Sequence, residues 1–310
     1  MSVLSPAATG FLEQLRNAGF KPFHQMTVEE ARAGMAGLFS MMGPGPSGVV
    51  STPLRIATPG GPLEARLLAP PGPPRALLVY LHGGGWVLGT IGDYDGIARE
   101  IAARTRSAVL LVDYRLAPEH RFPAQGDDAW AALTWAADQV GTIVPAGTPL
   151  VVAGDSAGGA LATALAQRAR NEAGPTIAAQ ILLCPVLQAD PGRFPSQHDP
   201  ACQIVIGTPD MAWFWDHYAP DETTRNSPEA SPLLCADLAG LPPALILTAE
   251  FDVNRDEAEA YSAALQAAGG TVRCERFAGE FHDFPVFAVL PSSTEAIERI
   301  DDFLTGLHKK

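Results

Sequence analysis

Short apolar runs rich in valine, isoleucine and leucine recur along the chain from residue 63 onward, and longer amphipathic stretches separate them. Each run has the length of a β-strand, and its nearly continuous hydrophobic character is typical of a strand buried on both faces of a sheet. The strands that this pattern predicts are LEARLLA (63–69), ALLVYL (76–81), AVLLVD (108–113), LVVAG (150–154), AQILLC (179–184), ALILTA (244–249) and TVRCERF (271–277).

The amphipathic stretches between the runs predict the helices that cross over from one strand to the next. They lie at about 93–106, 125–138, 157–172, 256–268 and 293–307. Strands that alternate with helices in this way are typical of a sheet with helices on both faces. The sequence therefore predicts an α/β fold with a mostly parallel, doubly wound sheet.

Two segments do not follow this alternation. Residues 1–45 have a helical pattern, and a Thr-x-x-Glu capping box at Thr27 predicts the start of one helix before a Gly/Pro-rich linker. Residues 186–232 are far longer than a crossover needs, and TPDMAWFWDH (208–217) within them predicts an aromatic helix. The aromatic side chains favour an ordered lid, and packing against the N-terminal helices remains an equal alternative.

Composition limits the partners. The 310 residues are 47% hydrophobic and 18% charged, as in a folded globular chain of one or two domains. Lysine and arginine number 21 against 34 aspartate and glutamate residues, which gives a net charge of −13. Because this charge repels phosphate backbones and anionic headgroups, we expect neither nucleic acid nor a membrane as a partner.

Features that the sequence lacks predict where the protein is located in the cell and whether it binds zinc. The first twenty residues show no basic start and no apolar core of a signal peptide, and no apolar run is long enough to span a bilayer, so we expect a cytoplasmic protein. The four cysteines lie far apart, without a CxxC pair or a nearby histidine. We therefore expect neither disulfides nor a zinc site.

The sharpest chemical signal is GDSAGG (154–159), which directly follows a predicted strand and precedes a predicted helix. It fits the G-x-S-x-G nucleophile elbow in its strand-turn-helix context, with Ser156 as the nucleophile. Small residues on both sides of Ser156 allow strand and helix to approach closely. The helix start also places free N–H groups beside the hydroxyl.

A second glycine-rich motif, HGGGW (82–86), directly follows the strand ALLVYL. It matches the loop that supplies oxyanion-hole N–H groups in lipases and esterases, because consecutive glycines leave backbone amides unshielded. A phosphate-binding loop is the alternative. It is disfavoured because neither a P-loop lysine nor a G-x-G-x-x-G spacing is present.

A serine hydroxyl needs a base, and the base needs an orienting acid, in the chain order Ser, Asp or Glu, His. His282 follows the last predicted strand across a short loop, which places it at the sheet edge beside the elbow. His198 and His217 lie in the insertion, and His308 lies in the C-terminal tail. We therefore assign His282 as general base and acid.

The orienting acid is expected at the end of the strand ALILTA. Asp252 is the preferred candidate and Glu250 is the alternative, since both follow this strand at its carboxyl end. Asp256 is expected to be a first-turn acid of the next helix.

Together these motifs resemble one enzyme family. HGGGW, GDSAGG and the final His282 combine with YRLAPEHRFPA (114–124), SPL (231–233) and LPPALILTAEFDVNRDEAEAY (241–261). The combination resembles the hormone-sensitive-lipase-like (family IV) branch of bacterial α/β-hydrolase carboxylesterases. The resemblance runs from about residue 60 to the end. It implies a helical cap from residues 1–45 and 186–232 over an α/β-hydrolase catalytic core from residues 46–185 and 233–310.

The resemblance also implies roles for individual residues. Ser156, Asp252 and His282 would form the catalytic triad, and the N–H groups of Gly84, Gly85 and Ala157 would form the oxyanion hole. His82 and Gly83 would shape the glycine loop. The substrate-pocket candidates are Trp86, Asp155, Phe214 and Trp215. Where the family commonly shows Asp-Pro-Leu-Arg-Asp, this chain has DVNRD (252–256), which alters the turn after the acid.

The activity that follows is hydrolysis of a small-molecule carboxylic ester through an acyl-enzyme, without a metal or organic cofactor. We expect short- to medium-chain esters, because an aromatic insertion narrows a pocket rather than offering an open lipid surface. The same triad acting on amides, lactones or carbamates is one alternative, and a non-catalytic small-molecule receptor on the same fold is another. The receptor is disfavoured because His282 is present. A monomer or a homodimer is expected.

Overall fold

A computed structural model describes residues 3–190 and 192–307, so His308 lies outside the described residues. Within them the chain forms an 8-stranded sheet with the order β1-β2-β4-β3-β5-β6-β7-β8. The strands are β1 (Val50–Thr58), β2 (Gly61–Ala69), β3 (Leu77–Leu81), β4 (Ala108–Val112), β5 (Leu150–Asp155), β6 (Ala179–Leu183), β7 (Ala244–Phe251) and β8 (Val272–Phe281). The α/β fold expected from the apolar pattern is confirmed.

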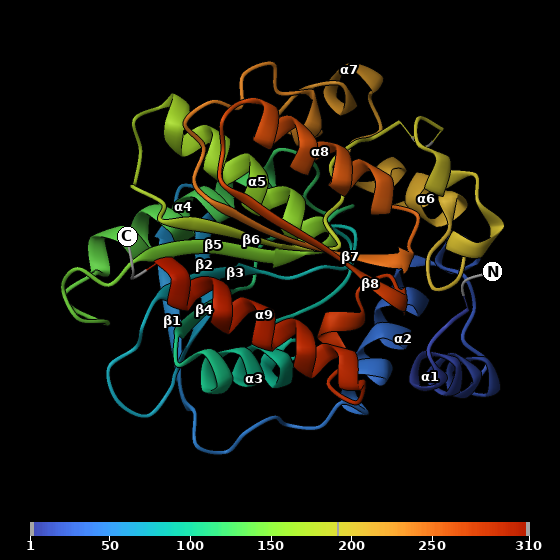
Figure 1. The fold of residues 1–310 in the computed structure, drawn as a ribbon, viewed down its shortest axis with the longest axis horizontal. Coiled ribbons are helices and arrows are strands. Elements are labelled where there is room, and N and C mark those ends of the chain that lie inside the picture. The colour runs from blue at the N-terminus through green and yellow to red at the C-terminus, as the bar shows by residue number, and fades with distance from the viewer. Residues whose placement is uncertain (1–2, 191, 308–310) are drawn as a thin grey trace.

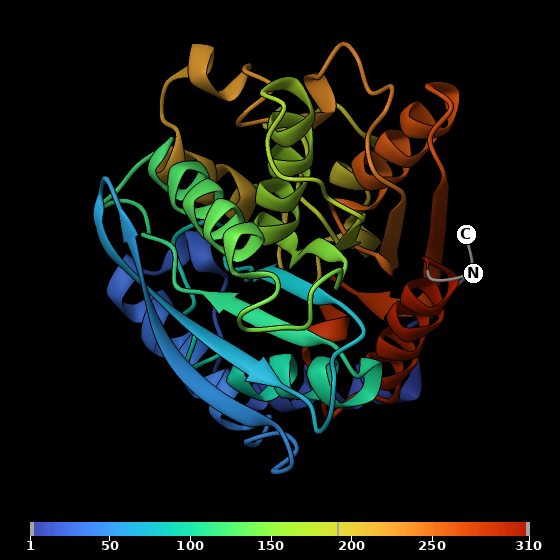
Figure 2. The same ribbon diagram turned by 90° about the vertical axis from the view of Figure 1, so that its left-hand side faces the viewer.

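Strands β3 to β8 pair in parallel, whereas β2 is antiparallel to both β1 and β4. The hairpin of β1 and β2 lies at one edge of the sheet (Figure 2). The apolar pattern did not predict β1. Its residues are mostly exposed, and only Ile56 within it is buried, so the strand lacks the continuous hydrophobic run of its parallel neighbours.

Helices cover both faces of the sheet (Figure 1). The helices α4 (Ala124–Gln139), α5 (Ser156–Asn171) and α8 (Arg255–Ala267) pack on one face, and α3 (Asp95–Thr105) and α9 (Pro291–Leu307) pack on the other. Successive residues of a strand point to opposite faces, so Leu77 and Val79 enter the first core while Leu78 and Tyr80 enter the second. Each crossover helix lies within about two residues of its predicted position.

The N-terminal segment contains α1 (Pro6–Asn17), the 3₁₀ turn η1 (Phe23–Gln25) and α2 (Val28–Ser40). The capping box predicted at Thr27 is present, because its hydroxyl accepts from the Glu30 N–H and the Glu30 side chain accepts from the Thr27 N–H. Helix α2 therefore begins where the sequence indicates.

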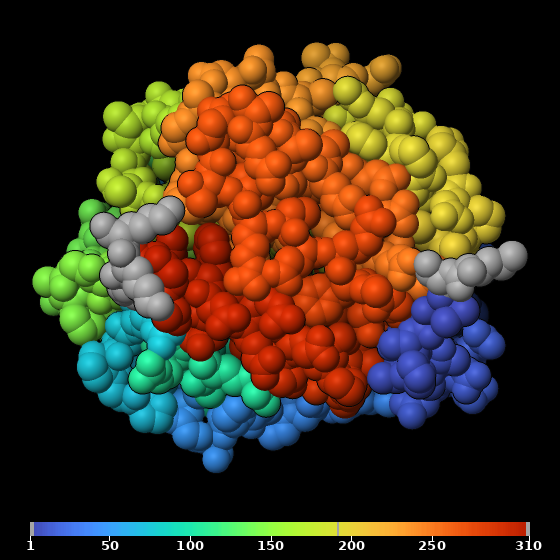
Figure 3. All heavy atoms as spheres, viewed as in Figure 1, coloured from blue at the N-terminus to red at the C-terminus, as the bar shows by residue number. Residues whose placement is uncertain are grey.

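The insertion between β6 and β7 folds into short elements around one longer helix. They are η2 (Pro195–Gln197), η3 (Pro200–Cys202), α6 (Thr208–Tyr218), α7 (Glu222–Arg225) and η4 (Pro232–Leu234). The insertion lies beside the N-terminal segment on one side of the molecule (Figure 3). The backbone N–H of His24 donates to Asp210 Oδ1 at 3.0 Å, which joins η1 to α6. The division into cap and core stays a prediction.

Strand β8 is longer than the sequence indicates. It continues through the expected loop to Phe281, which pairs with Phe251 of β7 after a register shift. His282 therefore follows the strand directly instead of across the expected short loop. Among residues 3–190 and 192–307, no helix is both long enough and apolar enough to cross a membrane.

Candidate active site

The serine occupies a sharp turn between β5 and α5. Ser156 is the first residue of α5 and has a φ of 49°, in the left-handed region that non-glycine residues rarely adopt. Gly158 packs against the end of β3 so closely that a Cβ atom there would lie 1.9 Å from the carbonyl oxygen of Leu81. The small residues of the motif thus allow α5 to start beside β3. The turn places the Ser156 hydroxyl at the start of this helix.

Three side chains that follow β5, β7 and β8 at the same edge of the sheet form one hydrogen-bonded chain. His282 Nε2 lies 3.0 Å from Ser156 Oγ, and His282 Nδ1 lies 3.0 Å from both Asp252 Oδ1 and Asp252 Oδ2. All three residues are buried. Because a carboxylate accepts, Nδ1 carries a proton and Nε2 is left to face the serine hydroxyl.

The two candidate acids have separate positions. Asp252 contacts the imidazole, whereas Glu250 Oε2 accepts from the backbone N–H of Gly279 at 2.8 Å. Asp252 also accepts from the N–H of Asn254 at 2.9 Å, which closes the turn in which this chain departs from the family pattern. Asp256 lies in the first turn of α8, as expected.

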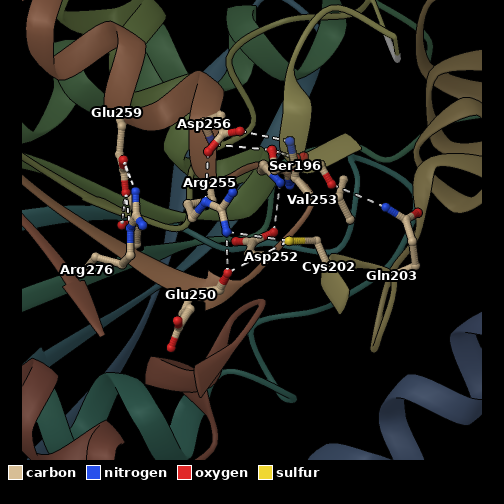
Figure 4. A network of polar contacts seen from close by, with 12 residues as sticks. Ser196, Cys202, Gln203, Glu250, Asp252, Val253, Arg255, Asp256, Glu259 and Arg276 are labelled. Atoms are coloured by element: carbon tan, nitrogen blue, oxygen red, sulfur yellow. Dashed lines mark hydrogen bonds and ion pairs between the residues drawn. The ribbon is translucent and has the colours of Figure 1, made fainter. Parts of the chain in front are cut away.

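The turn after Asp252 is fixed by the insertion (Figure 4). Ser196 Oγ donates to the carbonyl of Val253 at 2.8 Å, and the Ser196 N–H donates to Asp256 Oδ2 at 2.8 Å. Arg255 binds Asp256 at 2.7 Å and donates to the carbonyl of Glu250 at 2.6 Å. These contacts fix the turn that follows Asp252, although this chain lacks the proline that the family commonly has there.

A second carboxyl group faces the imidazole, and sequence reasoning missed it. Asp283 Oδ2 lies 3.2 Å from His282 Nε2. Burial by itself lowers the pKa of His282, but the charges of Asp252 and Asp283 and their hydrogen bonds outweigh burial, and the pKa is raised well above its usual value. The only signal in the sequence was the position of Asp283 directly after His282.

The glycine loop lies beside Ser156. Gly84 and Gly85 line the same cavity as Ser156 and His282. Within the described residues, no acceptor takes a hydrogen bond from the N–H of Gly84 or Gly85. Ala157 is the second residue of α5, where the N–H group has no partner inside the helix. These three amides are therefore available to an oxygen that develops negative charge.

His82 is held behind this loop. Its Nδ1 donates to the carbonyl oxygen of Gly83 at 2.8 Å, and its ring stacks on Tyr114 at a centroid distance of 4.3 Å. Burial lowers the pKa of His82 to about 4, although the hydrogen bond to Gly83 acts in the opposite direction. The ring is therefore neutral near pH 7 and acts as a fixed hydrogen-bond donor to the loop.

Helix α2 also holds the loop, through a residue that the sequence did not single out. Arg32 Nε donates to the carbonyl oxygen of Val87 at 2.9 Å, and Arg32 Nη2 donates to that of Ala117 at 2.9 Å. Its guanidinium also forms an ion pair with Glu119. One arginine of the N-terminal segment thus connects the end of the glycine loop to the turn 114–124.

The cavity beside Ser156 holds about 50 Å³ of free space and is largely apolar. Its walls come from the N-terminal segment, the glycine loop, the insertion and the end of η5 (Phe284–Val286). Helix α6 contributes Met211 and Phe214, and Phe214 also packs on Phe23 at a centroid distance of 5.4 Å. The helix therefore lines the cavity and contacts the N-terminal segment, as the two alternatives for the aromatic insertion allowed.

Of the four pocket candidates, Phe214 lines the cavity, and Trp86, Asp155 and Trp215 do not. Trp86 is fully buried. Its ring stacks on Tyr218 at a centroid distance of 4.1 Å and lies 4.7 Å from the ring of Trp215. The two indoles therefore fill the space between the glycine loop and α6. Phe214 and Trp215 are neighbours on α6 and so point to different faces of that helix, whereas Trp86 lies in the glycine loop and Asp155 ends β5.

Asp155 points beneath the glycine loop instead of into the cavity. Its carboxylate accepts from the hydroxyls of Tyr80 at 2.8 Å and Tyr94 at 3.1 Å. A Cβ atom on Gly83 would lie 2.2 Å from Asp155 Oδ2. Burial raises the pKa of Asp155 well above its usual value, with the charge of Asp283 in the same direction. The residue supports the loop from below.

One group of side chains has the composition of a metal site. Ligand atoms of Cys184, Asp252 and His282 lie within 4.8 Å of one another. Burial raises the pKa of the Cys184 thiol well above its usual value, and metals bind the thiolate rather than the thiol. Asp252 and His282 are also hydrogen-bonded to each other. The group is thus better suited to moving a proton than to holding an ion.

Comparisons with known proteins agree with this fold and geometry. The family model for the α/β-hydrolase fold matches residues 78–286. Esterase LipI of Mycobacterium tuberculosis is 38% identical over 255 residues, which cover 79% of this chain and 78% of LipI. Ethyl acetate hydrolase of Pseudomonas putida is 34% identical over 298 residues, which cover 91% of this chain and 92% of that protein.

A solved structure is similar over nearly the whole chain. The hyperthermophilic esterase from the archaeon Pyrobaculum calidifontis superimposes with a TM-score of 0.92 at 33% identity, over 99% of each chain. Because the family model covers more than half of the chain and the relatives cover more than two thirds of it, the chain belongs to the α/β-hydrolase family, in the hormone-sensitive-lipase-like branch that its motifs indicate.

Proposed function

We propose that this protein is a serine carboxylesterase that hydrolyses short- to medium-chain esters through an acyl-enzyme. The observation that carries the proposal is the hydrogen-bonded chain from Ser156 through His282 to Asp252, beside the free amides of the glycine loop. The relatives named above are an esterase and an ethyl acetate hydrolase, which supports the same reaction here.

In the proposed mechanism, Ser156 Oγ attacks the ester carbonyl while His282 Nε2 takes its proton. Asp252 keeps the proton on Nδ1 and stabilises the imidazolium that forms. The carbonyl oxygen becomes an oxyanion and accepts hydrogen bonds from the N–H groups of Gly84, Gly85 and Ala157. His282 then donates its proton to the leaving alcohol, which breaks the ester bond and leaves an acyl-serine.

Water completes the cycle by the same steps in reverse. His282 takes a proton from the water as it attacks the acyl-serine, and returns a proton to Ser156 Oγ when the acid leaves. In this scheme His82 and Gly83 keep the loop in shape, and no step needs a metal or an organic cofactor.

The size of the cavity supports a preference for small acyl groups. Its free space of about 50 Å³ is smaller than the roughly 150 Å³ of an engineered protein cavity that binds benzene. Phe214 and Met211 close one wall, and Phe20 and Leu15 close another. A short acyl chain fits with small side-chain adjustments, whereas a long one requires the wall to open.

A larger groove of about 730 Å³ lies outside this wall and shares Leu15, Phe20 and Val205 with the cavity. We infer that these three side chains separate the acyl-binding cavity from the surface. Cytoplasmic location and a monomeric or homodimeric state stay predictions from the sequence.

The proposal is tested by the turnover of p-nitrophenyl esters from acetate to palmitate, with and without a serine-directed organophosphate. Inhibitor-sensitive turnover that is fastest with short chains is the expected result. A rate that rises steadily to the longest chains would contradict the preference for short chains. No turnover by the folded protein would contradict the esterase itself and favour an amide bond or a receptor.

A further inference from the structure

Asp283 brings a second carboxyl group to the nitrogen that activates the serine. Its Oδ2 lies 3.2 Å from His282 Nε2, and the same Nε2 lies 3.0 Å from Ser156 Oγ. Asp283 has a φ of 58°, and this left-handed turn directs its side chain back toward the preceding histidine. The residue also lines the cavity, so it lies on the side from which substrate approaches.

The position of the protons follows from what each atom can donate. Asp252 holds the proton on His282 Nδ1, so a neutral imidazole presents a lone pair at Nε2. An ionised Asp283 also presents only lone pairs. Two acceptors at 3.2 Å repel each other, and the contact becomes attractive only when a proton lies between Nε2 and Oδ2. His282 and Asp283 therefore hold one proton in common.

The surroundings of the pair disfavour a free negative charge on Asp283. Asp283 Oδ1 is buried and has no hydrogen-bond partner within the described residues. Burial raises the pKa of Asp283, while the charge of His282 acts against this shift. The titratable groups that face the pair are acids, phenols and a thiol from neighbouring elements, namely Asp155, Asp252, Glu257, Tyr80, Tyr94 and Cys184.

We propose that Asp283 is a positioning residue that shares the Nε2 proton with His282 and sets the pH below which the enzyme loses activity. This inference rests on the proposed esterase function. As the pH rises, the pair releases one proton to solvent, and Nε2 can then accept the hydrogen bond from Ser156. Below that pH the proton occupies Nε2, and His282 cannot act as a base.

The sign of the effect follows from the charge. A carboxylate close to Nε2 stabilises the imidazolium and so keeps the proton bound to a higher pH. Removal of the carboxylate lets His282 lose its proton at lower pH. In Asp283→Asn, the midpoint of the acidic limb of kcat/KM should therefore move down by about one pH unit or more, the range typical of a nearby opposite charge.

The substitution is suited to the site because asparagine tolerates the left-handed conformation. Asp283→Gly, which is also compatible with a positive φ, provides a second variant and should give a shift in the same direction. The matched control is Glu280→Gln. Glu280 is a buried carboxyl three residues before Asp283, on β8, but it accepts from Ser5 Oγ at 2.9 Å rather than facing His282. Its acidic limb should match that of the unmodified protein.

Heteronuclear NMR of the imidazole nitrogens gives a readout that needs no ester. In the unmodified protein Nε2 of His282 should titrate in two steps, since two coupled groups share protons, and in Asp283→Asn in one step at lower pH. A single step in the unmodified protein, or an unshifted limb in both variants, would overturn the inference. If no ester is hydrolysed but the two-step titration is present, the esterase proposal fails while the shared proton stands.

Discussion

Gly85 lies beneath the ring of Phe214, so closely that a Cβ atom on Gly85 would be 2.1 Å from the ring carbon Cδ1. The glycine supplies one of the amides proposed for the oxyanion hole, and the ring belongs to α6 of the insertion. Gly85 also has a φ of 61°. The glycine loop and the insertion helix are therefore fitted to each other, and a side chain at this position would displace one of them.

Gly85→Ala should lower kcat/KM for p-nitrophenyl butyrate by roughly 10² to 10³, the usual effect of losing one oxyanion-hole donor. Phe214→Ala in the same chain should restore part of the loss, because the added methyl group then has space. Gly37→Ala on α2 is the control, since a Cβ atom there meets nothing within 4 Å. Equal activity of Gly85→Ala and Gly37→Ala would contradict the role given to this amide.

Asp252→Asn should lower kcat by about 10⁴, because an amide no longer fixes the proton on Nδ1 of His282. The measurement is steady-state turnover of p-nitrophenyl butyrate at saturating substrate. Glu250→Gln is the matched control, because Glu250 bonds to Gly279 instead of the imidazole. If the Glu250 variant lost as much activity as the Asp252 variant, the assignment of the acid would be wrong.

Trp86→Ala should destabilise the fold by about 3 to 5 kcal/mol, as expected for removal of a buried aromatic side chain. The indole is fully buried between Trp215 and Tyr218. Urea unfolding followed by circular dichroism measures the loss. Val289→Ala changes a side chain that is 54% exposed and should have little effect. A cost as small as that of Val289→Ala would show that the stack contributes nothing to stability.

Phe20→Ala should extend the range of acyl chains that the enzyme accepts. Phe20 lines both the cavity beside Ser156 and the outer groove, so its removal joins the two spaces. The ratio of kcat/KM for octanoate to that for butyrate should rise by about tenfold, in the range of a few added methylene contacts. Arg16→Ala, which changes only the outer groove, should leave the ratio unaltered. An unchanged ratio in Phe20→Ala would argue against this wall as the limit on chain length.

Much of the fold could be predicted from the sequence because the parallel strands are buried on both faces. A run such as AVLLV at 108–112 is apolar at every position, which is typical of a strand covered by helices on both faces of the sheet. Strand β1 was missed for the opposite reason, since its edge position leaves most of its residues exposed. The end of β8 was also missed, because its length is set by pairing with β7 instead of by its own apolar residues.

The three residues of the proposed triad were accessible to sequence reasoning because each one follows a strand at the same edge of the sheet. The residues that line the cavity could not be predicted in this way, because the shape of the cavity depends on which face of α6 meets the glycine loop. Phe214 and Trp215 are neighbours in sequence, yet one lines the cavity and the other packs on Trp86. Asp283 has no motif of its own, and only the left-handed turn after His282 reveals its contact with Nε2.

The central claim is that Ser156 is the nucleophile of an ester hydrolase. The most direct test is turnover of p-nitrophenyl butyrate by Ser156→Ala, with circular dichroism and thermal unfolding to verify the fold. The account predicts that the variant folds like the unmodified protein and that its activity falls to the level of the uncatalysed reaction or close to it. Near-normal turnover by the folded variant would contradict the account.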